Sequence, residues 1–249
     1  MISEYIPEEA QAIIESYKRL RIRDDKTVRC PYYRNPRSGR ERWGLNAFSG
    51  KGSPQELEGE LRIIEKLENK DFMNMGEEEI RDIMRKRRLG IDCSGFIAHI
   101  FDAWTMATKK KRLYQLLNFP AQTLWGRLAT TLRPFTHINI DTLVRPKNAT
   151  EFTDYQELRV GDLIRFNTEV DHAILVTRLQ TDASGGVLRN IWYVQSVKEK
   201  VGEGIKEGLV RVNNNTLPIV QQHWEEYPET GLTINRQGYP KFYHPRFLS

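Results

Sequence analysis

The stretch Asp92-Cys93-Ser94-Gly95-Phe96 begins an amphipathic segment near the middle of the chain. Apolar residues follow it at helical spacing, at Ile97, Ile100 and Trp104. Cys93 is therefore predicted in the first turn of a mostly buried helix. In that position, unpaired backbone N–H groups and the helix dipole favour a thiolate over a thiol, and the same N–H groups can hold an oxyanion. The stretch thus indicates a cysteine hydrolase.

A thiol nucleophile requires a base, and the base requires a third group that orients it. Residues 161–166 predict a turn that enters a strand, and residues 171–176 predict a second strand that begins at His172. Residues 191–197 predict a third strand, which pairs with the second in an antiparallel hairpin. This hairpin would bring the side-chain amide of Gln195 close to the imidazole, and the amide oxygen can accept an imidazole N–H.

Alternation along the strands limits the choice of the third group. Neighbouring residues point to opposite faces of a strand, so only one of Gln195 and Ser196 can face His172, and we favour Gln195. For the same reason Asp171 is not expected to orient its neighbour. Taken alone, Cys93 would be interpreted as a small buried hydrophobe and His172 as a half-buried strand residue. Their occurrence in order with the third segment favours catalytic roles.

Three ordered blocks, Asp-Cys-Ser-Gly-Phe, Gly-Asp-Leu-Ile-Arg-Phe and His-Ala-Ile-Leu-Val, resemble the NlpC/P60 family of papain-like cysteine peptidases across residues 90–200. The resemblance implies an α+β fold with a papain-like core, in which the nucleophile helix packs on an antiparallel sheet. It also implies hydrolysis of amide bonds in bacterial cell-wall (peptidoglycan) peptides, often between D-glutamate and a diamino acid.

The same resemblance assigns roles by position. Cys93 would be the nucleophile, His172 the base and Gln195 the orienting residue. Asp92 and Ser94 would hold the amino end of the substrate. Many members of the family have His in place of Gln at the third position, and many have a Tyr and a Trp-Gly-Gly stretch before the cysteine. Here a basic run precedes the cysteine instead, so the exact bond cleaved stays open.

The chain divides into three predicted parts. Residues 1–89 form a helical N-terminal extension, residues 90–200 the catalytic core, and residues 201–249 a C-terminal segment packed on the core. Three amphipathic helices are predicted in the extension, beginning near Pro7, after a Ser53–Glu56 capping box, and at about Glu77. A long irregular loop at about 30–52 separates the first two. It either shapes a substrate groove or simply packs on the core.

Composition is that of a globular protein with a formal net charge of +5. Only two cysteines are present, so no disulfide framework is expected. The five histidines show no ligand spacing, which predicts no metal site, and no motif indicates a cofactor. The basic runs at 85–88 and 109–112 are expected to complement helix dipoles rather than to bind nucleic acid.

Localisation and partners follow from what the sequence lacks. The first residues show no signal-peptide pattern and no apolar run is long enough to cross a membrane, so we expect a cytoplasmic protein with no membrane partner, although export by another route stays open. The expected partner is a peptide substrate, derived from the cell wall. The alternatives are a papain-like amidase, deamidase or acyltransferase acting on a protein or lipid, and a catalytically silent peptide-binding module.

Overall fold

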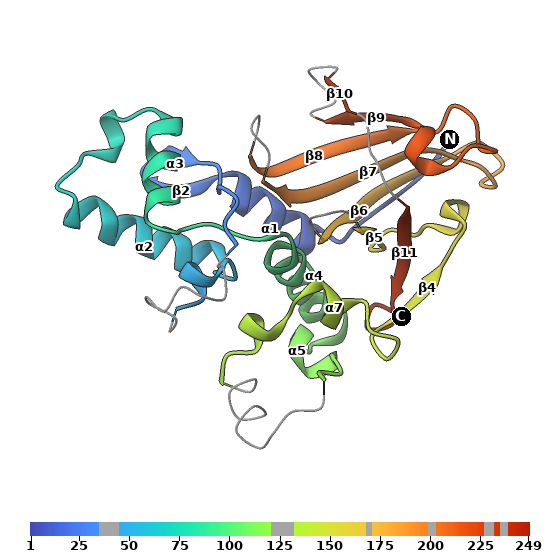
Figure 1. The fold of residues 1–249 in the computed structure, drawn as a ribbon, viewed down its shortest axis with the longest axis horizontal. Helices are drawn as coiled ribbons and strands as arrows, with labels where there is room; N and C mark the ends of the chain where they lie inside the picture. The colour runs from blue at the N-terminus through green and yellow to red at the C-terminus, as the bar shows by residue number, and fades with distance from the viewer. Residues whose placement is uncertain (35–44, 121–131, 168–170, 199–202, 227–231, 235–238) are drawn as a thin grey trace.

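The computed structural model describes residues 1–34, 45–120, 132–167, 171–198, 203–226, 232–234 and 239–249. It is an α+β protein in which a large antiparallel sheet packs against helices (Figure 1). The α+β class predicted from the sequence is therefore confirmed at this level. In Figure 1, helices α2 and α3 lie to one side of the sheet and α4 lies below it.

The main sheet has the strand order β10-β9-β8-β7-β6-β5-β11-β4, and β1 pairs with β6 off this path. Every pair in it is antiparallel. The strands are β1 (Ile2–Tyr5), β4 (Ala149–Phe152), β5 (Leu163–Asn167), β6 (Asp171–Thr181), β7 (Leu188–Val197), β8 (Gly204–Arg211), β9 (His223–Glu226), β10 (Leu232–Ile234) and β11 (Pro240–Pro245).

Strands β6 and β7 form the predicted hairpin. The turn between them is held by Asp182, whose Oδ1 atom accepts hydrogen bonds from the backbone N–H groups of Ser184 and Gly186. The buried side chains alternate between the two faces of the sheet: Ala173 and Leu175 face the core that contains α4, and Ile174 faces a second apolar cluster. The hairpin prediction is confirmed.

Helix α4 (Cys93–Lys109) lies against the sheet and against α1 (Glu8–Lys18). Its apolar stripe is buried, and the Phe96 ring meets the Tyr17 ring edge-on with centroids 5.4 Å apart. The helix predicted to begin at Cys93 is confirmed. The sheet, through β6 and β7, and helix α1 thus bury α4 from two sides.

The N-terminal residues form the three predicted helices, α1, α2 (Pro54–Leu67) and α3 (Glu77–Lys86). Ser53 and Glu56 make the expected capping box at the start of α2. The same residues also contribute strand β1 to the main sheet and a small hairpin of β2 (Leu20–Arg23) and β3 (Lys26–Val28). One continuous apolar cluster extends from Ile6 to Phe247, so this segment shares its core with α4 and the sheet.

The loop at about 30–52 and the C-terminal segment both contribute backbone pairing to the fold. Both ends of the loop at about 30–52 pair with Ile91, through bridges from Tyr32 and Lys51, whereas residues 35–44 lie outside the described residues. The C-terminal segment, residues 201–249, supplies β8, β9, β10 and β11, with β11 inserted between β5 and β4. Short helices complete the connections, including η1 (Asn46–Ser49), α5 (Leu113–Leu116) and α7 (Ile140–Leu143).

Candidate active site

The N-terminus of α4 is built around the carboxylate of Asp92. This N-cap residue accepts the backbone N–H of Gly95 at 2.6 Å through its Oδ1 atom. A Cβ atom on Gly95 would lie 2.4 Å from the carbonyl oxygen of Gly50. Only glycine allows this close approach between the helix start and the preceding loop, which explains the glycine in the sequence block.

Cys93 occupies the first turn of α4 and is 8% exposed. Burial raises the pKa of its thiol to about 11, and the Asp92 carboxylate adds to the rise. The Lys51 ammonium and hydrogen bonds from two backbone N–H groups, those of Ser94 and Ala173, lower the pKa by less. The expectation of a thiolate is therefore corrected: desolvation of the buried thiol raises the pKa by more than Lys51 and the two N–H groups lower it, so the resting group is a thiol.

His172 contacts Gln195, the residue favoured over Ser196 as its neighbour. The Nε2 atom of His172 lies 2.7 Å from the Oε1 atom of Gln195, and Gln195 is fully buried. The neighbouring Ser196 instead donates its hydroxyl to the carbonyl oxygen of Ile91 at 2.8 Å. Of the two alternatives, Gln195 is the residue that contacts the imidazole.

The start of β6 lies beside the first turn of α4. One of the two backbone N–H groups that contact the thiol of Cys93 belongs to Ala173, the residue directly after His172. The structure thus brings the backbone of β6 next to Cys93 and the side chain of Gln195 next to His172. The catalytic roles of Cys93, His172 and Gln195 stay predictions.

Asp92 and Ser94, the residues predicted to hold the substrate, contact a buried lysine. The Nζ atom of Lys51 donates to Asp92 Oδ1 at 2.8 Å and to Ser94 Oγ at 2.5 Å. The Lys51 side chain is only 8% exposed, and the Asp92 side chain 12%. The backbone carbonyl of Lys51 also contacts Nε2 of His99 at 2.9 Å, and burial lowers the pKa of His99. Sequence reasoning missed Lys51, since a lysine in a polar loop normally faces solvent.

A second residue that sequence reasoning missed is Tyr32. Burial raises the pKa of its phenol, and Cys93 and Asp92 each add to the rise, which places the hydroxyl near the thiol. Tyr32 reaches this position because its backbone pairs with Ile91, directly before Asp92. An aromatic residue in a loop was the available signal, but the separation of Tyr32 from Cys93 in the sequence hid their proximity.

A further layer lies behind Gln195. Its Nε2 atom donates to Oε1 of Glu226 at 2.5 Å, and the other carboxylate oxygen of Glu226 accepts from Lys206 Nζ at 2.7 Å. Both charged side chains are almost completely buried. Sequence reasoning did not identify either residue, because each lies in a segment whose alternating polar residues resemble a solvated strand face.

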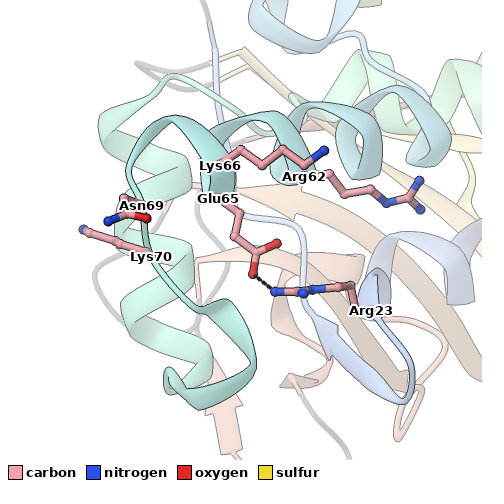
Figure 2. A pocket seen from close by; sticks show the side chains of 6 residues that line it. All are labelled: Arg23, Arg62, Glu65, Lys66, Asn69 and Lys70. Carbon is pink, nitrogen blue, oxygen red and sulfur yellow. Dashed lines mark hydrogen bonds and ion pairs between the residues drawn. The ribbon is translucent and has the colours of Figure 1, made fainter.

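A separate cavity of about 450 Å³ lies at the end of α2 (Figure 2). Its lining is largely cationic and includes none of the predicted site residues; Arg23 in it pairs with Glu65 at 2.5 Å. The lining residues are Arg23, Arg62, Glu65, Lys66, Asn69 and Lys70. Across the described residues, no group of three or more His, Cys, Asp or Glu side chains could hold a metal ion.

Comparisons of this chain with family models, with curated proteins and with solved structures find no match. Within the ranges that the structure describes, none of the helices combines the length and apolar character needed to cross a membrane. Function must therefore be inferred from the side chains gathered at the start of α4 and from the sequence blocks that contain them.

Proposed function

We propose that this chain is a cysteine hydrolase with a papain-like, NlpC/P60-type core, which cleaves amide bonds in bacterial cell-wall peptides. One observation supports the chemistry most strongly. A fully buried amide accepts the N–H of His172, and the next residue along β6 contacts the thiol of Cys93. A nucleophile, a base and an orienting group in this order match the arrangement that thiol catalysis needs. The wall-peptide substrate class rests on the three sequence blocks.

The order of proton transfers follows from the hydrogen bond to Gln195. Because an amide oxygen only accepts, Nε2 of His172 bears the proton and Nδ1 has the lone pair that can accept one. Nδ1 takes the thiol proton as Sγ of Cys93 attacks the scissile carbonyl carbon. His172 then passes that proton to the leaving amine as the C–N bond breaks, which leaves a thioester on the enzyme.

Hydrolysis of the thioester reverses these roles. Nδ1 of His172 removes a proton from water as the water oxygen attacks the thioester carbon, and the proton returns to Sγ as the thiol leaves. In both steps negative charge develops on the carbonyl oxygen. Across the described residues, the backbone N–H of Cys93 donates to no acceptor, so it is available to hold this oxyanion.

The pKa of the resting thiol adds a detail to the first step. Because burial raises the pKa of Cys93 to about 11, the thiolate is scarce at neutral pH. Deprotonation by His172 then accompanies the attack, rather than preceding it as a stable thiolate–imidazolium pair. Substrate binding that expels water from the site would strengthen this coupling.

The test is cleavage of a panel of wall peptides, with mass spectrometry to locate the bond cut. Wild type should cut one bond, and Cys93→Ala and His172→Ala should lose at least ~10³-fold in rate. The matched control is Cys30→Ala, which removes the other cysteine, also buried, and should keep wild-type activity. Cleavage by Cys93→Ala at the wild-type rate would contradict the proposal. If no wall peptide is cut while Cys93 is alkylated selectively, the substrate class is wrong and protein or acyl substrates come next.

A further inference from the structure

We propose that the buried Lys206–Glu226 ion pair is a positioning device that sets the direction of the Gln195 amide and, through it, the tautomer of His172. The inference rests on the proposed function, since it concerns the same base. Lys206 and Glu226 would act through two hydrogen bonds and would touch no substrate atom. Their role would be to keep the basic nitrogen of His172 on the side of the thiol.

The register of the sheet puts the four residues in a row. Gln195 on β7 lies directly opposite Lys206 on β8, and Glu226 on β9 lies opposite Gly208 of the same strand β8. Gln195 is 0% exposed, Lys206 2% and Glu226 1%. These three side chains are thus buried, and the hydrogen bonds described above join them across neighbouring strands of the sheet.

The charges of Lys206 and Glu226 set the direction of the hydrogen bonds that lead to His172. Nζ of Lys206 can only donate, and an ionised carboxylate can only accept. Glu226 accepts from Lys206 at 2.7 Å and from the Gln195 NH₂ group at 2.5 Å. The Gln195 oxygen is then turned toward His172, 2.7 Å away, and must receive a proton from Nε2. Nδ1 is left as the acceptor.

Glutamine cannot impose this direction by itself. Its oxygen and NH₂ group have nearly the same shape, so a rotated amide would fit the same space and would donate to His172 instead. His172 would then bear its proton on Nδ1 and could not accept one from the thiol. A buried ion pair also contributes little net stability compared with an apolar pair of the same size. Unlike apolar residues, Lys206 and Glu226 fix the orientation of the Gln195 amide.

The decisive variant is Glu226→Gln. The ammonium of Lys206, which contacts the carboxylate at 2.7 Å in wild type, attracts the oxygen of the new amide, so the new NH₂ group faces Gln195. The Gln195 amide must rotate, and its NH₂ group then donates to Nε2 of His172. We expect kcat/KM to fall by roughly 10²–10⁴-fold, the size of effect that a wrong tautomer of the base produces.

The double variant Lys206→Met/Glu226→Gln should recover activity. Without the ammonium, the amide at 226 is free to turn its oxygen back toward Gln195, which restores the original direction. We expect it to regain at least ~10-fold over Glu226→Gln, although it is further from wild type in sequence. If the pair served only to stabilise the sheet, the second substitution would add to the damage or leave it unchanged.

The control for folding is Lys206→Met/Glu226→Leu. Like the first double variant it removes both charges of the pair, but it also removes the oxygen that accepts from the Gln195 NH₂ group. We expect lower activity than in Lys206→Met/Glu226→Gln at a temperature at which both variants are folded. This comparison decides the question even if Glu226→Gln alone does not fold.

The tautomer itself can be measured without any substrate, from the ¹⁵N chemical shifts of His172, assigned with a His172→Gln variant. We expect the proton on Nε2 in wild type and on Nδ1 in Glu226→Gln. An unchanged tautomer in folded Glu226→Gln would overturn the inference, even if wall peptides are cleaved. If the tautomer changes as expected but no peptide is cleaved by wild type, the proposed substrate class fails and the positioning role stands.

Discussion

Replacement of Lys51 by methionine should lower the stability of the fold by an amount that follows from the contacts of its ammonium. Methionine fills a similar volume, so the main loss is the ammonium that contacts Asp92 at 2.8 Å and Ser94 at 2.5 Å. The Asp92 carboxylate would keep its hydrogen bonds from the Ser94 hydroxyl and the Gly95 N–H, but would lose its counter-charge in a buried position.

Breaking a buried ion pair by removing one partner costs about 3–5 kcal/mol. The two remaining donors to Asp92 place Lys51→Met at the low end, near 3 kcal/mol. For a chain of this size each kcal/mol lowers the melting temperature by about 2–4 °C, so we expect a fall of roughly 6–12 °C. The pKa of Cys93 should rise further, because the Lys51 ammonium lowers it in wild type. Alkylation of Cys93 at pH 8 should therefore slow.

The assay is thermal unfolding combined with the rate of iodoacetamide labelling at Cys93. Lys51→Met/Asp92→Asn should recover most of the lost stability, because no charge is then left unpaired and the asparagine oxygen can still cap α4. Lys241→Met, which removes an exposed lysine paired with Glu151, should leave both readouts unchanged. A melting temperature and labelling rate for Lys51→Met equal to those of wild type would refute the reasoning.

The remaining predictions concern three other features. Iodoacetamide should label Cys93 but not the fully buried Cys30. The labelling rate of Cys93 should rise from pH 6 to pH 9, because burial raises its pKa to about 11. A labelling rate, measured by peptide mapping, that has already reached a plateau at pH 6 would contradict this. Burial raises the pKa of Asp162 to about 6, so the folded protein binds this proton more tightly than the unfolded chain does. Relative to Asp162→Asn, wild type should therefore gain about 1 kcal/mol in urea unfolding between pH 7 and pH 5, and a constant difference would count against it. Gly95→Ala should lower the free energy of unfolding by about 1–3 kcal/mol, because the added Cβ atom clashes with the neighbouring backbone. Gly59→Ala, with open space around it in α2, should raise the free energy of unfolding by up to ~1 kcal/mol. Equal effects of the two substitutions would show that the close approach at Gly95 does not matter.

Local sequence patterns were sufficient to predict the elements that present the site. The 3.6-residue period after Cys93 and the two-residue period after His172 are properties of short segments, and both define the elements found. Alternation along β7 limited the neighbour of the imidazole to one of Gln195 and Ser196, and the favoured residue, Gln195, is the one that contacts it.

The pairing of distant segments could not be predicted in this way. Strand β1 joins β6, and β11 enters between β5 and β4, although each pair is far apart in the chain. Short strands carry no local signal for their partner, since any alternating strand can pair with another.

The buried charges of the site were missed for a related reason. Lys51, Lys206 and Glu226 belong to residue types that are rarely buried, and their partners are set by contacts between distant segments. The same long-range packing explains the thiol of Cys93. The helix end predicted a thiolate, but the depth of burial depends on the sheet, on α1 and on the loop that contains Lys51, none of which the sequence block reveals.

The most direct measurement is the mass of the enzyme quenched in acid during turnover of a wall peptide. Nucleophilic catalysis predicts a hydroxylamine-sensitive thioester, equal in mass to the acyl part of the substrate, on the proteolytic fragment that contains Cys93. It should be absent in Cys93→Ala, which should also leave the peptide uncut. An adduct on a different residue, or cleavage by Cys93→Ala at the wild-type rate, would contradict the assignment of Cys93 as the nucleophile.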